Sequence, residues 1–233
     1  MLETNKFGGM GHWWWKLLCI ILVFYTFING FLISIPTLPI LEQSIRNLFF
    51  HVPMWFTMII LMLVSTIYGL KYLAKEDIGD DVKSYNIAVV GFVFGLIGLA
   101  TGMIWAKVTW GAWWVFEEVK LNAAGAGVLI YAAYFILRGS IEEEEKKARF
   151  SAVYNIFAFV MFFVFIMVIP RLDVNSLHPG NGGNPGFNQY DLDNNLRMVF
   201  YPAVIGFILL GGWISQLFIR IELISRKKMG LDD

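Results

Sequence analysis

The sequence contains three histidines, His12, His51 and His178, and imidazole is the side chain that most often binds a transition metal at neutral pH. His12 lies in the segment GHWWWK, where tryptophans beside a lysine are typical of a membrane interface, and we assign it no ligand role. His51 lies in RNLFFHVPMW, and His178 lies in SLHPG. Two neutral imidazoles can bind one metal ion from opposite sides, each through one ring nitrogen. His51 and His178 are therefore the candidate metal ligands.

A second unusual segment, TWGAWWVFEEVKLN, contains three of the nine tryptophans within a short stretch. Its large flat rings belong to Trp110, Trp113, Trp114 and Phe116. A tryptophan buries roughly 150–250 Å² when it is covered, so this cluster can offer a broad apolar surface to a flat ligand. The alternative is an aromatic belt at the membrane interface, which requires neither a cluster on one segment nor the two glutamates that follow it.

Haem is a ligand that fits both features. Its iron accepts axial histidines, its ring is flat and largely apolar, and its two propionates require cations. Trp55 lies four residues after His51, on the same face of a helix. The candidate partners of the propionates are Arg46, Lys107, Lys120 and Arg171. Histidines that only make structural hydrogen bonds are the alternative, and residue chemistry alone leaves this question open.

Long apolar segments must position these residues. Of the 233 residues, 58% are hydrophobic and only 15% are charged, against about 25% charged in a typical soluble domain. Six segments approach the ~20 apolar residues that a membrane-spanning helix needs. They are 16–35, 52–73, 87–105, 121–137, 152–170 and 196–219. Since no alternating period-2 pattern recurs, we predict an all-α integral membrane protein whose residues 1–233 form a single six-helix domain.

The distribution of basic residues predicts how the chain is oriented. Thirteen of the 18 lysines and arginines lie in the termini and in the second and fourth connections, and five lie in the other three connections. Because basic residues mark the cytoplasmic side, both termini should be cytoplasmic. The connections that carry His51, the tryptophans and His178 should then face outward. Pro53 should lie in the first turn of the second helix, and the charged segments KEDIGDDVK and EEEEKKAR should be solvated connectors.

Several kinds of chemistry are not indicated. Cys19 is the only cysteine, so an internal disulfide and a C-x-x-C metal or redox motif are excluded. The sequence contains neither a C-x-x-C-H haem-attachment motif nor a GxxxxGK[ST] phosphate loop. The first apolar segment does not resemble a cleaved signal peptide. If ATP drives the process, another subunit must hydrolyse it.

The segment WGAWWVFEE resembles the WGxWWxWD signature of haem-handling proteins of cytochrome c maturation, and it is most similar to that of the CcmC, or haem exporter protein C, family. RNLFFHVPMW resembles the family segment R-x-x-x-x-H-V-P, and NSLHPG resembles its [ST]-L-H segment. GMIWAKVTWGAWW, with Trp105 and Lys107, resembles the region that leads into the tryptophan motif. Phe116 and Glu117 depart from the signature, which has tryptophan and aspartate there.

The resemblance implies six helices with both termini inside, a tryptophan-rich loop between helices 3 and 4, and a place in the bacterial inner membrane with the site facing the periplasm. It implies that haem b is bound as cargo between His51 and His178, that Trp110, Trp113 and Trp114 support the ring, and that Arg46 contacts a propionate. The implied partners are a CcmE-type haem chaperone, the ABC transporter subunits CcmA and CcmB, and the small protein CcmD.

Other functions are compatible with parts of the pattern. A cytochrome b-type electron-transfer subunit would hold haem by histidines inside its helices, and no histidine here is predicted to lie mid-membrane. A permease for another solute would carry ionisable residues within its spans, and the six segments have almost none. A cytochrome c synthase, which attaches haem directly, shares the tryptophan signature but is larger. We therefore expect a haem-delivery protein that is not itself an enzyme, and we expect haem to arrive from the lipid or from a neighbouring subunit.

Overall fold

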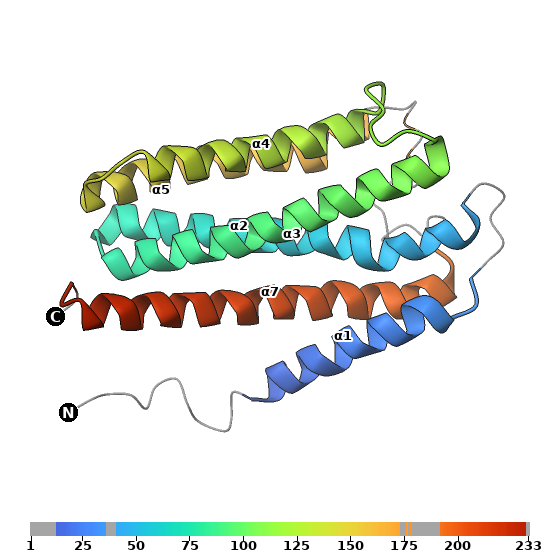
Figure 1. Cartoon of the computed structure of the whole chain (residues 1–233), viewed down its shortest axis with the longest axis horizontal. Helices are drawn as coiled ribbons and strands as arrows, with labels where there is room; N and C mark the ends of the chain where they lie inside the picture. The colour runs from blue at the N-terminus through green and yellow to red at the C-terminus, as the bar shows by residue number, and fades with distance from the viewer. Residues whose placement is uncertain (1–12, 36–40, 173–175, 177, 179–191, 232–233) are drawn as a thin grey trace.

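The structure is a bundle of long helices, shown in Figure 1. The computed structural model describes residues 13–35, 41–172, 176, 178 and 192–231, and this part of the chain is helical with short connections. The elements are α1 (Trp14–Leu32), the 3₁₀ helix η3 (Glu42–Asn47), α2 (Leu48–Lys75), α3 (Ile78–Trp110), α4 (Val119–Gly139), α5 (Glu144–Phe163), the π-helical turn η4 (Val164–Val168), α6 (Ile169–Leu172) and α7 (Asn194–Lys228).

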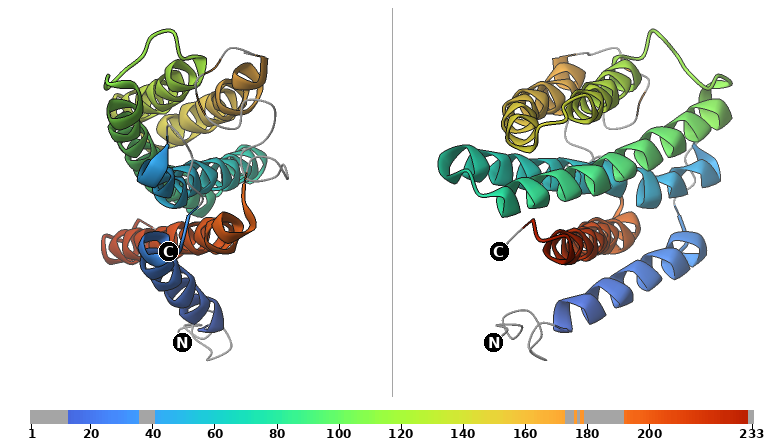
Figure 2. Two further views of the ribbon diagram at one scale, coloured as in Figure 1. Left: turned by 90° about the vertical axis from the view of Figure 1, so that its right-hand side faces the viewer. Right: turned by 60° about the vertical axis from the view of Figure 1, so that its left-hand side comes forward.

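Six helices are long and apolar enough to cross a membrane, which confirms the predicted number of spans. Two of them include more than one element: η3 continues into α2 in the span Glu42–Lys75, and α5, η4 and α6 together form the span Glu144–Leu172. α2 and α3 lie in the middle of the bundle, α4 and α5 lie on one side, and α7 followed by α1 lies on the other (Figures 1 and 2). The orientation of the bundle in the membrane stays a prediction.

The ends of the helices differ from the apolar segments. α3 begins at Ile78 rather than 87 because the side chain of Asp77 caps it, accepting a hydrogen bond from the backbone N–H of Gly79 at 2.8 Å. It continues to Trp110 and ends where Gly111 adopts a left-handed conformation with φ of 79°. Trp110 therefore belongs to the last turn of α3 rather than to the loop, which comprises residues 111–118.

The prediction that Pro53 lies in the first turn of its helix is wrong. α2 starts at Leu48, directly after η3, so Pro53 lies inside the helix and His51 lies in the first turn. Proline has no N–H to donate to the carbonyl one turn earlier, that of Phe49. The mean hydropathy of a segment cannot detect this early start, because the preceding residues Glu42–Asn47 are polar.

A row of glycines lets α3 approach α2 closely. Gly91, Gly95, Gly98 and Gly102 recur at helical spacing on one face of α3, and each lies against a side chain of α2. A Cβ atom at Gly98 would lie 3.1 Å from the indole of Trp55, and one at Gly102 would lie 2.7 Å from Cε1 of His51. Small residues of this kind are the usual means by which helices approach each other within membranes. The glycines therefore leave room for the two aromatic rings of α2.

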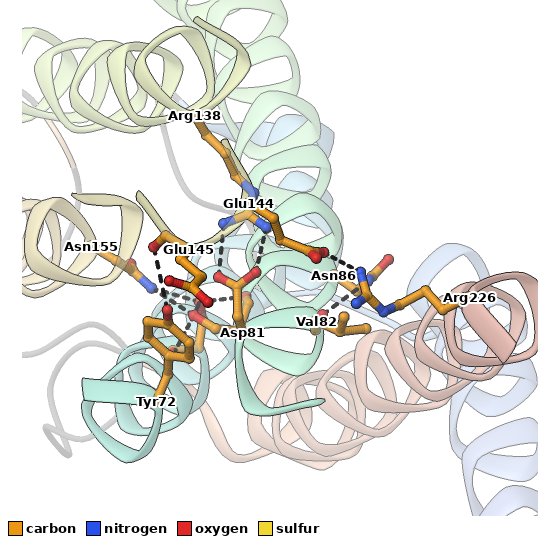
Figure 3. A network of polar contacts seen from close by, with 11 residues as sticks. Tyr72, Asp81, Val82, Asn86, Arg138, Glu144, Glu145, Asn155 and Arg226 are labelled. Atoms are coloured by element: carbon orange, nitrogen blue, oxygen red, sulfur yellow. Dashed lines mark hydrogen bonds and ion pairs between the residues drawn. The ribbon is translucent and has the colours of Figure 1, made fainter. Parts of the chain in front are cut away.

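Two ion pairs, one between α3 and α4 and one between α5 and α7, lie at the end of the bundle where α1 begins and α7 ends (Figure 3). Arg138 of α4 donates from both Nη atoms to the carboxylate of Asp81 on α3, at 2.8 and 2.6 Å. Their side chains are only 12% and 7% exposed. Arg226 of α7 is paired with Glu144 of α5 at 2.5 Å. The prediction of a solvated connector is therefore wrong for Asp81, because the residue lies in the first turn of α3 and faces Arg138.

We expect Asp81→Ala to lower the free energy of unfolding by roughly 3–5 kcal/mol, because it leaves the buried guanidinium of Arg138 without its counter-charge. Thermal unfolding of the purified protein in detergent measures this. Arg149→Ala is the control: Arg149 and Glu76 pair with side chains 64% and 66% exposed, so its melting temperature should stay near the wild-type value. Equal shifts in the two variants would contradict the prediction.

Candidate functional site

His51 is held in a defined orientation between α2 and α3. Its Nδ1 atom lies 2.9 Å from the carbonyl oxygen of Gly98 and 3.3 Å from Oγ1 of Thr101. Because a carbonyl oxygen only accepts hydrogen bonds, Nδ1 must carry the proton of the neutral ring. The other nitrogen, Nε2, then presents its lone pair. A backbone carbonyl that orients an imidazole in this way is the usual second partner of a metal-binding histidine.

His178 lies beside His51, although 127 positions separate them in the sequence. Their ring centroids are 6.4 Å apart, with an angle of 40° between the ring planes. A metal–imidazole nitrogen bond of about 2 Å places the centres of two opposed imidazoles roughly 6 Å apart. The observed separation therefore matches that of two ligands on opposite sides of one metal ion.

Tryptophans surround this pair. The ring centroid of His178 lies 5.6 Å from that of Trp105 and 6.4 Å from that of Trp110, and these two indoles meet edge to face at 5.1 Å. Trp55 lies on the next turn of α2 after His51, and the centroids of the two rings are 6.4 Å apart. Trp105 continues the glycine face of α3, three residues after Gly102, and for that reason it faces the histidines.

The other rings of the tryptophan loop lie differently. Trp114 packs over Gly125 of α4, where an added Cβ would lie 2.7 Å from its ring, and its Nε1 donates to Oδ1 of Asn122 at 3.0 Å. Asn122 also donates to the carbonyl of Phe116 at 2.6 Å, so this side chain ties the loop to α4. The side chains of Trp113 and Phe116 are 54% and 79% exposed. Of the four rings predicted to form a platform, Trp110 thus contacts His178, Trp114 anchors the loop, and the remaining two are exposed.

The four predicted cationic residues all make hydrogen bonds. Arg46 donates to the carbonyls of Gly30 and Ile33 at 2.8 and 2.9 Å, and thereby fastens the end of α1 to η3. Its Nε also donates to Gln43 at 2.9 Å, so two of its five N–H groups are not used in these three bonds.

The other three lie on different elements. Lys107 donates to the carbonyl of Gly111 at 2.8 Å, and Arg171 donates to that of Met167. Lys120 donates to the carbonyl of His178 at 3.4 Å. Lys120 is therefore the cation that the structure brings to the second histidine.

Two residues at the site were not assigned from the sequence. Glu118, only 2% exposed, is the N-cap of α4 and accepts hydrogen bonds from the backbone N–H of Lys120 at 3.2 Å and from Ser176 Oγ at 2.6 Å. Ser176 in turn accepts a hydrogen bond from the backbone N–H of His178 at 3.2 Å. An acidic residue just before a helix is a signal for capping, but the contact with Ser176 joins distant segments and has no local sequence signature. His12 lies outside the described residues.

The fold and the site define a helical membrane protein that presents two imidazoles and several indoles at one end of its bundle. Comparison with protein families matches residues 3–231 to the family described as heme exporter protein C, CcmC. Because the match spans nearly the whole sequence, the chain belongs to the CcmC family. This confirms the family suggested by the histidine and tryptophan segments.

Individual relatives agree with this assignment. The chain is 24% identical over 188 residues to heme exporter protein C of Paracoccus denitrificans, which covers 79% of this chain and 75% of the relative. It is 25% identical over 192 residues to heme exporter protein C of Escherichia coli, covering 80% of this chain and 73% of the relative. A shorter match of 58 residues, 45% identical, links it to the cytochrome c biogenesis protein CcsA of Prochlorococcus marinus and covers 25% of this chain and 18% of that protein.

We expect His51 of the metal-free protein to carry its proton on Nδ1, because the carbonyl of Gly98 is its nearest acceptor. The ¹⁵N resonances of the imidazole, recorded at alkaline pH in detergent, distinguish the two tautomers. Gly102→Val should displace the ring and change these resonances. Gly212→Ala should not, because nothing lies within 4 Å of a Cβ at that position. A proton on Nε2 of wild-type His51 would contradict the assigned orientation.

Proposed function

We propose that the protein binds haem b between His51 and His178 and delivers it to a membrane-anchored chaperone of the CcmE type for the maturation of c-type cytochromes. The observation that carries this proposal is the pair of imidazoles 6.4 Å apart, surrounded by Trp105 and Trp110. Membership of the heme exporter protein C family supports it.

The set of donors favours haem over a bare metal ion. Structural zinc sites use four protein ligands and catalytic ones three. Among the described residues there is no group of three or more His, Cys, Asp and Glu side chains that could hold a metal ion. Two imidazoles suffice when the cargo supplies the remaining ligands itself, as a porphyrin does with its four nitrogens. The neighbouring indoles suit its flat apolar ring.

Transient binding is consistent with what holds His51. A carboxylate bonded to the second ring nitrogen raises the basicity of a metal-binding histidine. Here the acceptor is the neutral carbonyl of Gly98, together with the hydroxyl of Thr101. The ring of His51 is thus oriented by uncharged groups and has no carboxylate partner at Nδ1. This suits a site that must release its ligand.

The location of the pair favours delivery at one surface rather than electron transfer across the membrane. His51 occupies the first turn of α2, and His178 follows the span that ends at Leu172. In the proposed orientation this end of the bundle faces the periplasm of a bacterial inner membrane. The exposed rings of Trp113 and Phe116 lie on the loop 111–118, where a chaperone can reach them. CcmA, CcmB and CcmD are the proposed companions, and haem would enter from the lipid or from one of these subunits.

The proposal predicts that His51→Ala and His178→Ala each weaken the binding of haem at least roughly 100-fold, since loss of a group that only hydrogen-bonds to a metal ligand already costs about 10- to 100-fold. Purified full-length variants are titrated with haemin, and absorption spectra are recorded in the oxidised and reduced states. The wild-type protein should show a six-coordinate low-spin spectrum. His12→Ala is the matched control and should bind as the wild type does. If the two variants at positions 51 and 178 retain wild-type haem content, the proposal is wrong.

Delivery to a chaperone and direct attachment to a cytochrome make opposite predictions. The haem-loaded protein is incubated with an apocytochrome peptide containing C-x-x-C-H, in the presence and in the absence of a CcmE-type chaperone. We expect haem to appear covalently on the chaperone and not on the peptide. Trp113→Ala and Phe116→Ala should slow this transfer while leaving the low-spin spectrum intact, because both rings are exposed beyond the histidines. Covalent haem on the peptide without chaperone would instead identify a synthase.

A further inference from the structure

Building on the proposed haem site, we propose that Glu118 is a positioning residue for His178, and that it acts through the hydroxyl of Ser176. The three residues come from two separate parts of the chain: Glu118 is the N-cap of α4, whereas Ser176 and His178 follow the span Glu144–Leu172. Their hydrogen bonds form one connected series that ends at the backbone of the histidine. On this view the buried carboxylate sets where the second axial ligand lies.

The burial of Glu118 requires an explanation, because an ionised carboxylate is strongly destabilised in an apolar environment unless hydrogen bonds compensate it. Glu118 is only 2% exposed. The backbone N–H of Lys120 donates to this carboxylate at 3.2 Å, at the positive end of the α4 dipole. The short bond of 2.6 Å from Ser176 Oγ has the length of a charge-assisted hydrogen bond. The carboxylate is therefore matched to a donor from the His178 segment as well as to its own helix.

The direction of these bonds follows from the chemistry of the groups. A carboxylate only accepts, so the single hydroxyl proton of Ser176 is directed to Glu118. The oxygen of Ser176 then presents its lone pairs to the N–H of His178, at 3.2 Å. On the other side of the same residue, Lys120 donates to the carbonyl of His178 at 3.4 Å. Both backbone groups of the histidine are thus connected to the start of α4, and its ring lies against Trp105 and Trp110.

The neighbouring glutamate provides an internal comparison. Glu117 is exposed, whereas Glu118 is buried and bonded to Ser176. The tryptophan signature, matched without a gap, aligns its acidic residue with Glu117. The structure instead assigns the positioning role to Glu118, one residue later, at the point where the chain enters α4.

A purely structural role for Glu118 as the cap of α4 predicts different behaviour. In that case only changes to Glu118 itself should matter, and they should act on stability. Ser176→Ala leaves the bond between Glu118 and the N–H of Lys120 in place, but it removes the connection to His178. It therefore separates the two roles, even if Glu118→Ala fails to fold.

The test uses the purified full-length protein in detergent, titrated with haemin. We expect Ser176→Ala to raise the dissociation constant for haem about tenfold, as loss of a hydrogen bond that positions a metal ligand does, and to convert part of the low-spin spectrum to a five-coordinate high-spin one. Ser176→Thr, which keeps the hydroxyl, should restore both properties. Glu117→Ala is the matched control and should behave as the wild type. Wild-type affinity and spectrum in Ser176→Ala, together with loss of haem in His178→Ala, would overturn the positioning role while leaving the proposed function standing.

A second measurement does not depend on haem. Hydrogen exchange of the backbone amide of His178 in the metal-free protein should be faster in Ser176→Ala and in Glu118→Ala than in the wild type or in Glu117→Ala, because the acceptor of that amide is lost or misplaced. Unchanged exchange in Ser176→Ala would overturn the connection between Glu118 and His178. If His178→Ala binds haem as the wild type does, the proposed function fails, and the connection is then judged by the exchange measurement alone.

Discussion

The close approach of α3 to α2 is the constraint on which the rest of the site depends. Within a membrane there is no hydrophobic force between apolar helices, so their contact depends on how closely the backbones and side chains fit. The glycine face of α3 supplies that fit, and it does so in register with His51 and Trp55 of α2. Any side chain larger than hydrogen at Gly102 would occupy the space of the His51 ring. The same packing that stabilises the centre of the bundle therefore also orients the ring of His51, the first of the two proposed ligands.

The two ends of the bundle use polar groups in different ways. At one end, ion pairs such as Arg138 with Asp81 join α3, α4, α5 and α7, where their charges compensate one another. At the site, His51 is oriented by a backbone carbonyl and a hydroxyl, and His178 by Ser176 and Lys120. At the first of these ends, ion pairs thus connect the helices. The other end places two imidazoles among indoles, an arrangement consistent with the proposed flat apolar ligand that carries its own metal.

The tryptophan segment divides into parts with separate tasks. Trp110 closes α3 and contacts His178, whereas Trp114 and Asn122 fasten the loop to α4. Trp113 and Phe116 extend outward. The replacement of the signature tryptophan by Phe116 therefore affects an exposed ring. Of the two glutamates that follow it, Glu117 is exposed, whereas Glu118 is buried and caps α4.

The sequence alone determined the number of candidate spans and the family, and it predicted the two histidines that the structure places side by side, because hydropathy, residue type and the spacing within short motifs are local properties. It also indicated that Trp105, Trp110 and Trp55 belong near those histidines. It could not locate the true ends of α2 and α3, which depend on η3, on the cap by Asp77 and on Gly111 rather than on apolar length. Nor could it show that Arg46 fastens α1, that Asp81 is buried against Arg138, or that Glu118 reaches Ser176. Those contacts join residues far apart in the chain, and they exist only because helix packing brings their partners within hydrogen-bonding distance.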